Sequence, residues 1–354
     1  MNDNSLLTEV FEKHSELIDL RAPIEFSAGS LPGAVNLPIL DDDERANVGK
    51  TYKIKGKEAA LSLGFKLVSG TKREERISLW REYLSNKSGP LIFCYRGGKR
   101  SEIAQSWLGE SGVYVDRIEC GYKGIRAELL SVFEKEHSLM LLGGKTGVGK
   151  TKILSEFHQS IDLELLANHR GSAFGRHLNE QPTQGKFENE LAVELYKKRG
   201  LQKIIIEDEG KLIGRISIPK PFQKTMASSP LIVIEANLDC RVQNIWEEYI
   251  LEQSANYEKS FGSEGIEKFS EYLVLSNYKI KKKLGNQLHE EIEKKIMKAF
   301  RKKKPELHKD WIKIVLERYY DPMYEYQLAK KIDRLNFSGT SSEVRAWITA
   351  FFEN

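Results

Sequence analysis

The stretch LIFCYRGGKRSEIA, residues 91–104, brings together one cysteine, two glycines and three basic residues. LIF is typical of a buried strand and SEIAQSWL of a helix that begins near Ser101, so Cys94 is expected on the loop between them. Backbone N–H groups at a helix N-terminus favour an anion, and the glycines let the loop curl so that its amides face inward. We therefore predict that Cys94 is a thiolate nucleophile in an anion-binding loop. The loop residues expected to hold the anion are Arg96, Gly97, Gly98, Lys99 and Arg100.

A second group, LLGGKTGVGKTKIL, includes an apolar run and matches the phosphate-binding pattern G-x-x-x-x-G-K-[ST]. In this pattern backbone amides surround a diphosphate, Lys150 would neutralise it, and Thr151 is placed to ligate Mg²⁺. The pattern alone predicts only that a di- or triphosphate binds. Downstream, KIIIEDE could place Asp208 (or Glu207) near the metal, although a strand end with solvated acids explains it equally well. The expected diphosphate-binding residues are Gly144, Lys145, Thr146, Gly147, Val148, Gly149, Lys150 and Thr151.

A third stretch, IDLELLANHRGSAFG, matches no general motif but is dense in polar side chains flanked by glycines. A lone histidine is more often a structural hydrogen-bonding group than a catalyst. Beside an arginine and downstream of a phosphate-binding loop, a role around the phosphate site is about equally expected. The candidates are Asn168, His169 and Arg170.

Positive charge is concentrated near the C-terminus. Lys279–Arg334 holds 17 Lys and Arg against nine Asp and Glu, a surplus of eight in a chain of net charge +4. This asymmetry favours a polyanionic partner. Lys294, Lys298 and Arg301 fall on one face of a predicted helix, where they would contact phosphates without reading sequence, although a solvated helix face fits the same pattern. Candidates for stacking on a splayed base are Tyr319, Tyr320, Tyr324 and Tyr326.

Three segments are expected to position these groups. Residues 1–134 alternate short apolar runs with helical stretches, which is an α/β pattern. Residues 135–256 contain SLMLLGG near their start and further strand candidates at 203–206 and 231–235. In residues 257–354 apolar side chains recur at helical spacing and no strand is predicted. We expect two α/β domains followed by a mainly helical, basic C-terminal region.

The length and composition of the chain argue against a membrane protein and against a disulfide-rich protein. The 354 residues are enough for two or three domains, and no apolar run approaches the ~18 residues of a membrane span. Three scattered cysteines favour neither a disulfide framework nor a C-x-x-C metal site, so Cys120 and Cys240 are interpreted as structural. We expect a soluble, cytoplasmic protein with no membrane partner.

The Cys94 segment resembles a rhodanese domain, whose cysteine carries sulfur or selenium as a persulfide-type species. The stretch LIDLRAPIEFSAGSLPGAVNLP fits the same family. One departure concerns the loop, because five residues separate Cys94 from Arg100 where rhodaneses have four. That length is similar to the loop of dual-specificity phosphatases, which holds a phosphate, so phosphate or selenophosphate becomes a plausible ligand. The matching residues of the earlier stretch are Asp19, Arg21, Glu25, Gly29, Pro32, Gly33, Ala34 and Asn36.

The order of segments, with NHRGSAFG, EDE and RYYDPMYEY after the phosphate-binding loop, resembles the tRNA 2-selenouridine synthases over essentially the whole chain. This resemblance implies conversion of wobble 2-thiouridine in tRNAs for Lys, Glu and Gln. It implies S-geranylation from geranyl diphosphate, followed by replacement of the S-geranyl group with selenium from selenophosphate. The phosphate-binding loop would hold the prenyl diphosphate, and the Cys94 loop selenophosphate.

Two other classes fit the residues. A nucleotide-dependent phosphatase or kinase could use the Cys94 loop and the phosphate-binding loop, and binding of ATP in preference to geranyl diphosphate would reveal it. An RNA-binding protein without catalytic activity is the third alternative.

Overall fold

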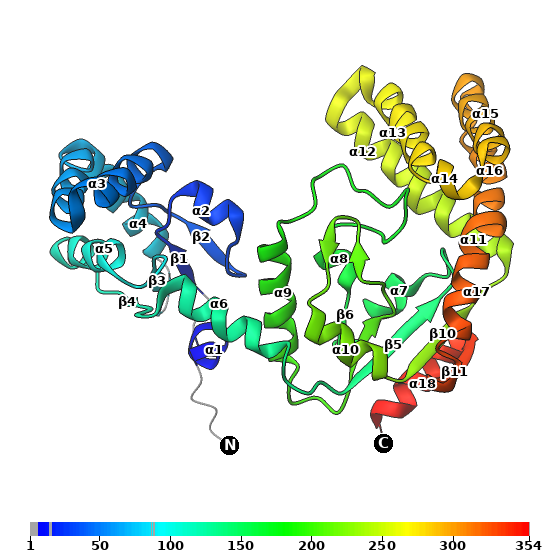
Figure 1. Cartoon of the computed structure of the whole chain (residues 1–354), viewed down its shortest axis with the longest axis horizontal. Helices are drawn as coiled ribbons and strands as arrows, with labels where there is room; N and C mark the ends of the chain where they lie inside the picture. The colour runs from blue at the N-terminus through cyan, green and yellow to red at the C-terminus, as the bar shows by residue number, and fades with distance from the viewer. Residues whose placement is uncertain (1–5, 14–15, 86, 88, 354) are drawn as a thin grey trace. The chain divides into compact units, whose positions relative to one another are not determined.

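In the computed structural model, residues 6–13, 16–85, 87 and 89–353 are described. The chain forms two compact units, drawn in Figure 1. The first unit comprises Met1–Lys135 and Thr183–Lys197, and the second comprises Glu136–Pro182 and Lys198–Asn354. No helix in the described ranges is long and apolar enough to cross a membrane.

The first unit is built on a four-stranded parallel sheet in the order β2-β1-β3-β4. β3 is apolar and buried along its whole length, as the LIF run predicts. The strands are β1 Leu17–Asp19, β2 Ala34–Asn36, β3 Leu91–Phe93 and β4 Asp116–Arg117. The helices are α1 Leu6–Thr8, η1 Glu9–Lys13, α2 Pro23–Ala28, α3 Asp42–Leu67, α4 Thr71–Leu84, α5 Lys99–Glu110, α6 Gly121–Val132 and α9 Gln184–Lys197.

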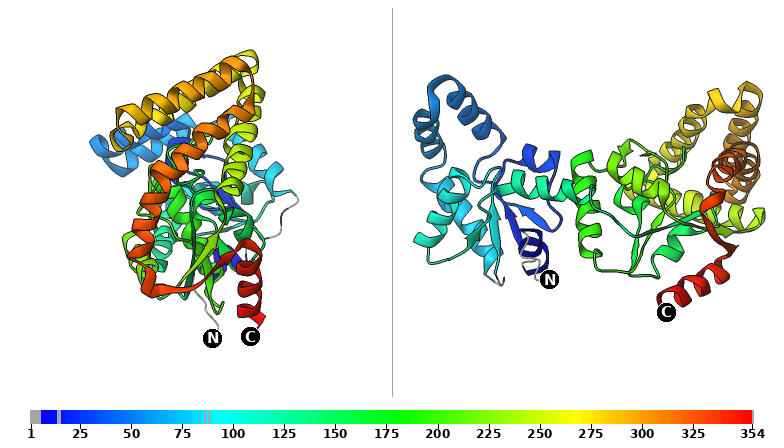
Figure 2. Two further views of the ribbon diagram at one scale, coloured as in Figure 1. Left: turned by 90° about the vertical axis from the view of Figure 1, so that its right-hand side faces the viewer. Right: turned by 60° about the horizontal axis from the view of Figure 1, so that its bottom comes forward.

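Helix α3 is broken at Gly56, whose φ of 83° lies outside the helical region and in the range that favours glycine. Its N-terminus is capped by Asp41, which accepts a hydrogen bond from the Glu44 amide while the Glu44 side chain accepts one from the Asp41 amide. The result is two helical segments that meet at the break (Figure 2). Most residues of α3 are exposed, so its sequence has no apolar periodicity from which the helix could be predicted.

The second unit is built on a five-stranded parallel sheet in the order β11-β10-β5-β7-β6. All six residues of the central strand β5 are buried. The strands are β5 Leu139–Gly144, β6 Ser160–Ile161, β7 Ile204–Glu207, β10 Leu231–Glu235 and β11 Leu335–Thr340, with a separate antiparallel pair, β8 Leu212–Ile213 and β9 Ile216–Ser217. The short helices around the sheet are α7 Lys150–Leu154, α8 Leu163–Leu166, α10 Lys220–Ser228 and α11 Leu238–Ile245.

A helical region follows α11 and confirms the expected fold class of two parallel-sheet α/β parts with a mainly helical C-terminal region. Its elements are η2 Trp246–Leu251, α12 Glu252–Phe261, η3 Gly262–Glu264, α13 Gly265–Lys279, α14 Lys281–Leu284, α15 Asn286–Lys302, η4 Pro305–Leu307, α16 His308–Val315, η5 Leu316–Tyr320, α17 Asp321–Ala329, η6 Ile332–Arg334 and α18 Ser341–Glu353.

The expectation that no strand lies beyond residue 257 was wrong. β11 pairs in parallel with β10 at the edge of the second sheet. Its sequence, LNFSGT, has no continuous apolar run, and its residues are only partly buried because an edge strand has one neighbour. The last strand of the sheet therefore comes from the C-terminal segment.

The expected domain boundaries also differ from the compact units. Residues 257–354 do not separate from the P-loop part, because Tyr257 and Phe269 share one apolar core with Val242 and Ile245 of α11. Helix α9, expected in the central domain, belongs to the first unit. There Asn189 donates to the Ser30 carbonyl at 2.8 Å.

Candidate functional site

Cys94 lies on the loop between β3 and α5, as predicted, but its side chain is buried at 3% exposure. Its Sγ is 3.3 Å from Ser101 Oγ and 3.8 Å from the Gly98 carbonyl oxygen. The backbone N–H groups of Tyr95–Arg100 donate to no acceptor within the described residues. These N–H groups, and the N-terminus of the 12-residue helix α5, leave the loop able to receive an anion.

Gly97 is required by the path of this loop. It has a φ of 65°, and a Cβ there would lie 1.8 Å from the Glu119 carbonyl oxygen. Gly121 has a φ of 60° and approaches Gly97 equally closely, with its Cβ position 2.3 Å from the Gly97 nitrogen. The loop therefore packs against the 119–121 turn, a partner that its own sequence did not indicate.

The three basic residues of the loop differ in their contacts. Arg100 is ion-paired to Glu25, with 2.5 Å between Nη1 and Oε2. Lys99 is exposed and pairs with Glu102 within α5. Arg96 is exposed and has no ion pair with any residue in the described ranges. Arg96 is therefore the loop cation that is free to meet a ligand.

The rhodanese-like stretch contributes a group of buried polar side chains to the first unit. Asp19 and Arg21 form a buried ion pair, with 2.6 Å between Oδ2 and Nη2. Arg21 also donates to the Gly29 carbonyl at 2.8 Å and lies over the ring of Tyr122. Burial would raise the pKa of Glu25, but hydrogen bonds and ion pairs with Arg100 and Arg45 hold it below its ordinary value. Asp19, Arg21, Glu25 and Gly29 of the rhodanese-like stretch thus form one connected structure.

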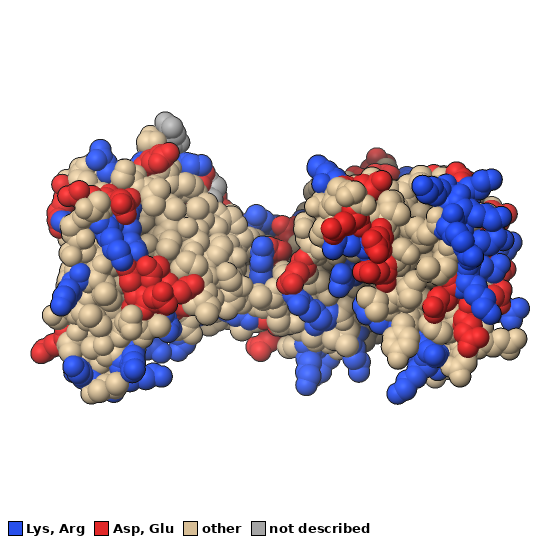
Figure 3. Space-filling view, turned by 90° about the horizontal axis from the view of Figure 1, so that it is seen from above, with Lys and Arg blue, Asp and Glu red and all other residues tan. Residues whose placement is uncertain are grey.

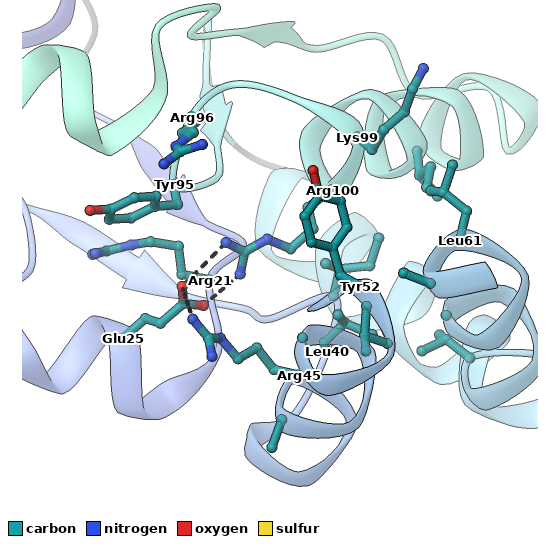
Figure 4. Close-up of a pocket in the computed structure, with 18 of the residues that line it drawn as sticks. Arg21, Glu25, Leu40, Arg45, Tyr52, Leu61, Tyr95, Arg96, Lys99 and Arg100 are labelled. Atoms are coloured by element: carbon teal, nitrogen blue, oxygen red, sulfur yellow. Dashed lines mark hydrogen bonds and ion pairs between the residues drawn. The ribbon is translucent and has the colours of Figure 1, made fainter. Parts of the chain in front are cut away.

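A large cavity of about 1370 Å³ opens beside the Cys94 loop, entirely within the first unit (Figure 4). One side is formed by residues of the loop and of α5, and the other by both segments of α3. In Figure 4 the side chains of Arg45 and Arg100 point toward Glu25, at one side of the cavity. Its apolar wall includes Leu40, Val48, Leu61, Phe65, Ile103 and Trp107. Sequence reasoning missed this cavity, because α3 lacks an apolar stripe.

The phosphate-binding loop follows β5 in the second unit, as the motif requires. Gly147 and Gly149 have φ values of 84° and 86°, and a Cβ on Gly147 would lie 2.8 Å from the Arg241 carbonyl oxygen. The helix that follows, α7, has five residues. Thr151 is exposed at its start.

Side chains from α11 and α17 brace this loop. Arg241 is buried and forms a two-bond ion pair with Asp321, both bonds being 2.7 Å. It also donates to the Thr146 carbonyl at 3.4 Å, and Asn244 donates to the Gly147 carbonyl at 2.8 Å. Lys145 is held by Glu325 at 2.6 Å, so this lysine is already engaged by a carboxylate.

Lys150 lies among acidic side chains, of which Glu164 and Glu209 were not assigned from the sequence. Burial alone would lower the pKa of Lys150, but Glu164, Glu209 and Glu207, with Asp208, hold it above its ordinary value. Burial raises the pKa of Glu164 to about 8, and the negative charge of Glu209 adds to this rise, whereas the charge of Lys150 opposes it. Near neutral pH Glu164 is therefore mostly protonated beside a charged Lys150. The sequence shows Asp162 and Glu164 two residues apart, but nothing in it places Glu164 near Lys150.

The acids expected near a metal already have partners in the folded chain. Both Asp208 oxygens are bound by Lys331 Nζ, at 2.6 and 2.7 Å. Glu207 is fully buried, and its Oε2 accepts the backbone N–H of Glu164. Within the described ranges no three His, Cys, Asp or Glu side chains are grouped so that they could hold a metal ion. Asp208 is thus ion-paired to Lys331, and its place near a metal stays a prediction.

The polar residues of the NHRG stretch differ in their contacts. Asn168 has a φ of 48°, and its side chain donates to the Asn179 and Glu180 carbonyls at 3.1 Å. His169 is buried, and burial with nearby positive charge lowers its pKa to about 4, so it is neutral. Arg170 pairs with Glu252 at 3.2 Å, but its Nη1 is buried without a partner. Arg170 Nη1 and His169 Nδ1 are the two buried side-chain atoms of this stretch that have no hydrogen-bond partner among the described residues.

The predicted basic face lies on α15. Lys294, Lys298 and Arg301 are exposed, and no residue in the described part of the chain forms an ion pair with them. Lys and Arg side chains gather over the C-terminal helices in Figure 3. The tyrosines divide differently from the expectation. Tyr320 is buried and accepts the Ala173 N–H, so it cannot stack on a base, whereas Tyr326 is 61% exposed.

Comparisons with known proteins agree with this arrangement. Residues 4–128 match the rhodanese-like domain, and residues 137–354 match the tRNA 2-selenouridine synthase AAA domain. A tRNA 2-selenouridine synthase of Hahella chejuensis is 43% identical over 346 residues, covering 95% of this chain and 91% of the relative. Relatives with the same name from Pseudomonas fluorescens (41%, 95% of each chain) and Shewanella denitrificans (39%, 98% and 97%) are similar. The first unit carries a cysteine loop, the second unit carries a phosphate-binding loop, and the matches extend over nearly the full length. The chain therefore belongs to the tRNA 2-selenouridine synthase family.

Proposed function

We propose that the protein converts 2-thiouridine at the wobble position of tRNA into 2-selenouridine in two steps. The first step transfers a geranyl group from geranyl diphosphate to the thiouridine sulfur. The second replaces the S-geranyl group with selenium from selenophosphate. Relatives named tRNA 2-selenouridine synthase support the overall conversion. The substrates we propose are the tRNAs for Lys, Glu and Gln.

The alkylation in the first step prepares the sulfur to leave in the second. In the first, the thiouridine sulfur attacks the first carbon of the geranyl chain, the C–O bond breaks, diphosphate leaves with the electron pair, and N3 loses its proton. A thiocarbonyl sulfur is a poor leaving group, and alkylation makes it a good one. In the second, selenium adds to C2 and the C–S bond breaks, so that geranyl thiolate leaves and takes a proton. Water then cleaves the Se–P bond, which yields phosphate and returns a proton to N3.

The pair of anion sites in one chain carries this proposal. The phosphate-binding loop with its charged Lys150 suits the diphosphate leaving group, since a positive charge there stabilises the charge that develops. The free N–H groups of the Cys94 loop and the exposed Arg96 suit selenophosphate. Because Cys94 Sγ is buried against Ser101, we assign Cys94 to the selenium step without assigning a covalent intermediate to it.

The exposed basic face of α15 is proposed to hold the tRNA backbone. Its lysines and arginine carry no competing ion pair among the described residues, so their charge is free for phosphates. Contacts of this kind position a nucleic acid and do not read its sequence.

Nucleoside analysis tests the proposal directly. Wobble nucleosides of tRNA from cells with and without the protein are compared by mass spectrometry. The purified protein is then supplied with a 2-thiouridine anticodon stem-loop, geranyl diphosphate and selenophosphate. We expect 2-selenouridine only when the protein is present, and S-geranyl-2-thiouridine when selenophosphate is withheld. Formation of 2-selenouridine without geranyl diphosphate would contradict the two-step route.

A further inference from the structure

The cavity beside the Cys94 loop is far larger than the anion that the loop would hold. Selenophosphate has five heavy atoms, whereas the cavity measures about 1370 Å³ and exceeds the ~300–1,000 Å³ of ordinary small-molecule sites. Most of this space is lined by apolar side chains of α3 and α5, such as Leu61, Phe65 and Trp107. A small charged anion does not need a large apolar surface around it. The apolar part of the cavity therefore indicates a ligand that also has an apolar part.

Basic side chains outnumber acidic ones in the lining of the cavity. Eight of its lining residues are Lys or Arg, and one, Glu25, is acidic. Glu25 already pairs with Arg100 and Arg45. Lys50, Lys53 and Lys57 are exposed on α3 and form no ion pair with any residue among those described. The cavity therefore fits a ligand that combines an apolar chain with several phosphates.

The apolar recess beside the phosphate-binding loop of the second unit is much smaller. The apolar recess beside its phosphate-binding loop, lined by Thr146, Phe174 and Trp311 among others, measures about 20 Å³. That volume accommodates about one water molecule. Within the described residues, the large apolar cavity thus lies in the unit that carries Cys94.

We propose that this cavity receives the geranyl chain of the S-geranyl wobble nucleotide during the selenium step. This inference rests on the proposed function. The chain lies along the apolar residues of α3 and α5, the flanking RNA phosphates meet the lysines of α3, and C2 of the base faces the anion loop. The small residues Ala46, Gly49 and Ala60 on the cavity side of α3 leave the room that the chain needs. The S-geranyl group is then a recognition element as well as a leaving group.

Chain-length specificity tests this assignment. Stem-loops carrying S-geranyl- or S-methyl-2-thiouridine are incubated with selenophosphate, and kcat/KM for 2-selenouridine formation is measured. We expect the protein to prefer the S-geranyl substrate by at least about tenfold. Leu61→Trp, which adds bulk to the apolar wall of the cavity, should lower kcat/KM for the S-geranyl substrate by about tenfold or more, while the S-methyl substrate changes by less than about twofold. The milder Ala46→Leu should act in the same direction and guards against misfolding.

Ile54→Trp is the matched control, because Ile54 lies on α3 at 67% exposure and does not line the cavity. It should leave both substrates unaffected. Equal losses on both substrates in Leu61→Trp and Ala46→Leu would overturn the inference, as would an unchanged preference for the geranyl chain.

Binding measurements separate this inference from its alternatives. Leu61→Trp should bind geranyl diphosphate as the unaltered protein does, and should bind the S-geranyl stem-loop more weakly. Loss of geranyl diphosphate affinity in Leu61→Trp would mean that the cavity holds the donor, and would overturn the inference. If the protein forms no 2-selenouridine from any substrate, the proposed function fails. The stem-loop affinities still test whether the cavity holds the geranyl chain. Tighter binding of the S-geranyl than of the S-methyl stem-loop, with the difference lost in Leu61→Trp, would support the inference. Equal binding of the two stem-loops would overturn it.

Discussion

Arg100, on the loop that carries Cys94, is ion-paired to Glu25 of α2, a residue 75 positions earlier in the chain. Glu25 is 13% exposed and Arg100 is 23% exposed, so water screens the pair only partly. The pair connects the anion loop to the segment that contains Asp19 and Arg21. The conformation of the loop therefore depends on a carboxylate outside it.

Replacing Arg100 with alanine should destabilise the protein by roughly 1–3 kcal/mol at pH 7, because Glu25 would lose its main partner. The pKa of Glu25 lies below its ordinary value in the folded protein, so its stabilising contribution is present above about pH 4.5 and is lost as pH falls through the folded pKa. The effect of Arg100→Ala should shrink at pH 4. Urea unfolding at both pH values, with Glu25→Gln and the double variant, measures the coupling. Additive effects of the two substitutions would contradict it.

Cys94→Ala should block selenium incorporation and leave S-geranylation largely intact, because Cys94 and Lys150 lie in different units. S-geranyl-2-thiouridine should then accumulate in a stem-loop assay followed by mass spectrometry. Cys120→Ala and Cys240→Ala, at exposed positions, are the controls and should leave both steps unchanged. Equal loss of both steps in folded Cys94→Ala would contradict the assignment of two sites.

Lys150→Ala should weaken binding of geranyl diphosphate by about 2–4 kcal/mol, as expected when a charge that meets a diphosphate is removed. Titration calorimetry with geranyl diphosphate and with ATP measures this loss and the preference between the two ligands. Lys152→Ala is the matched control, since Lys152 lies on the same helix but is exposed and paired with Glu248. Unchanged affinity in Lys150→Ala, or a preference for ATP, would give the loop another role.

Glu164→Gln should change how stability depends on pH. The pKa of Glu164 is raised to about 8 in the folded protein, so the folded state binds more protons than the unfolded chain between about pH 4.5 and 8. This group therefore lowers stability as pH rises through that range, and the glutamine variant should show a flatter profile in urea unfolding. Glu156→Gln, at an exposed residue paired with Arg345, serves as the control. Parallel profiles for Glu164→Gln and the unaltered protein would contradict the assignment.

Neutralising Lys294, Lys298 and Arg301 together should weaken tRNA binding whatever the anticodon. The slope of log affinity against log salt should flatten by up to ~0.9 for each phosphate that the variant no longer binds on duplex, or nearer ~0.7 on single strands. Filter-binding titrations at several salt concentrations measure the slope. A matched triple variant at the exposed Lys211, Lys220 and Lys224 should change it less. An unaltered slope in the first variant would make this face of α15 an ordinary solvated surface.

The sequence by itself determined the two loops and their order along the chain. Strand, glycine-rich turn and helix are encoded within about a dozen neighbouring residues, so the local pattern around Cys94 and around Lys150 predicts backbone that the structure contains. The same holds for the exposed basic face of α15, because helical spacing alone places its three cations together.

Interactions between distant segments were decided only by the tertiary structure. Glu25 meets Arg100, Lys331 meets Asp208, and Glu164 approaches Lys150, yet no period or motif relates the members of these pairs. The cavity arises where an α3 without an apolar stripe faces α5, and β11 joins the sheet as a partly buried edge. Burial and charge pairing act through space, so the availability of Asp208 or the charge of Glu164 follows from neighbours that only the folded chain brings together.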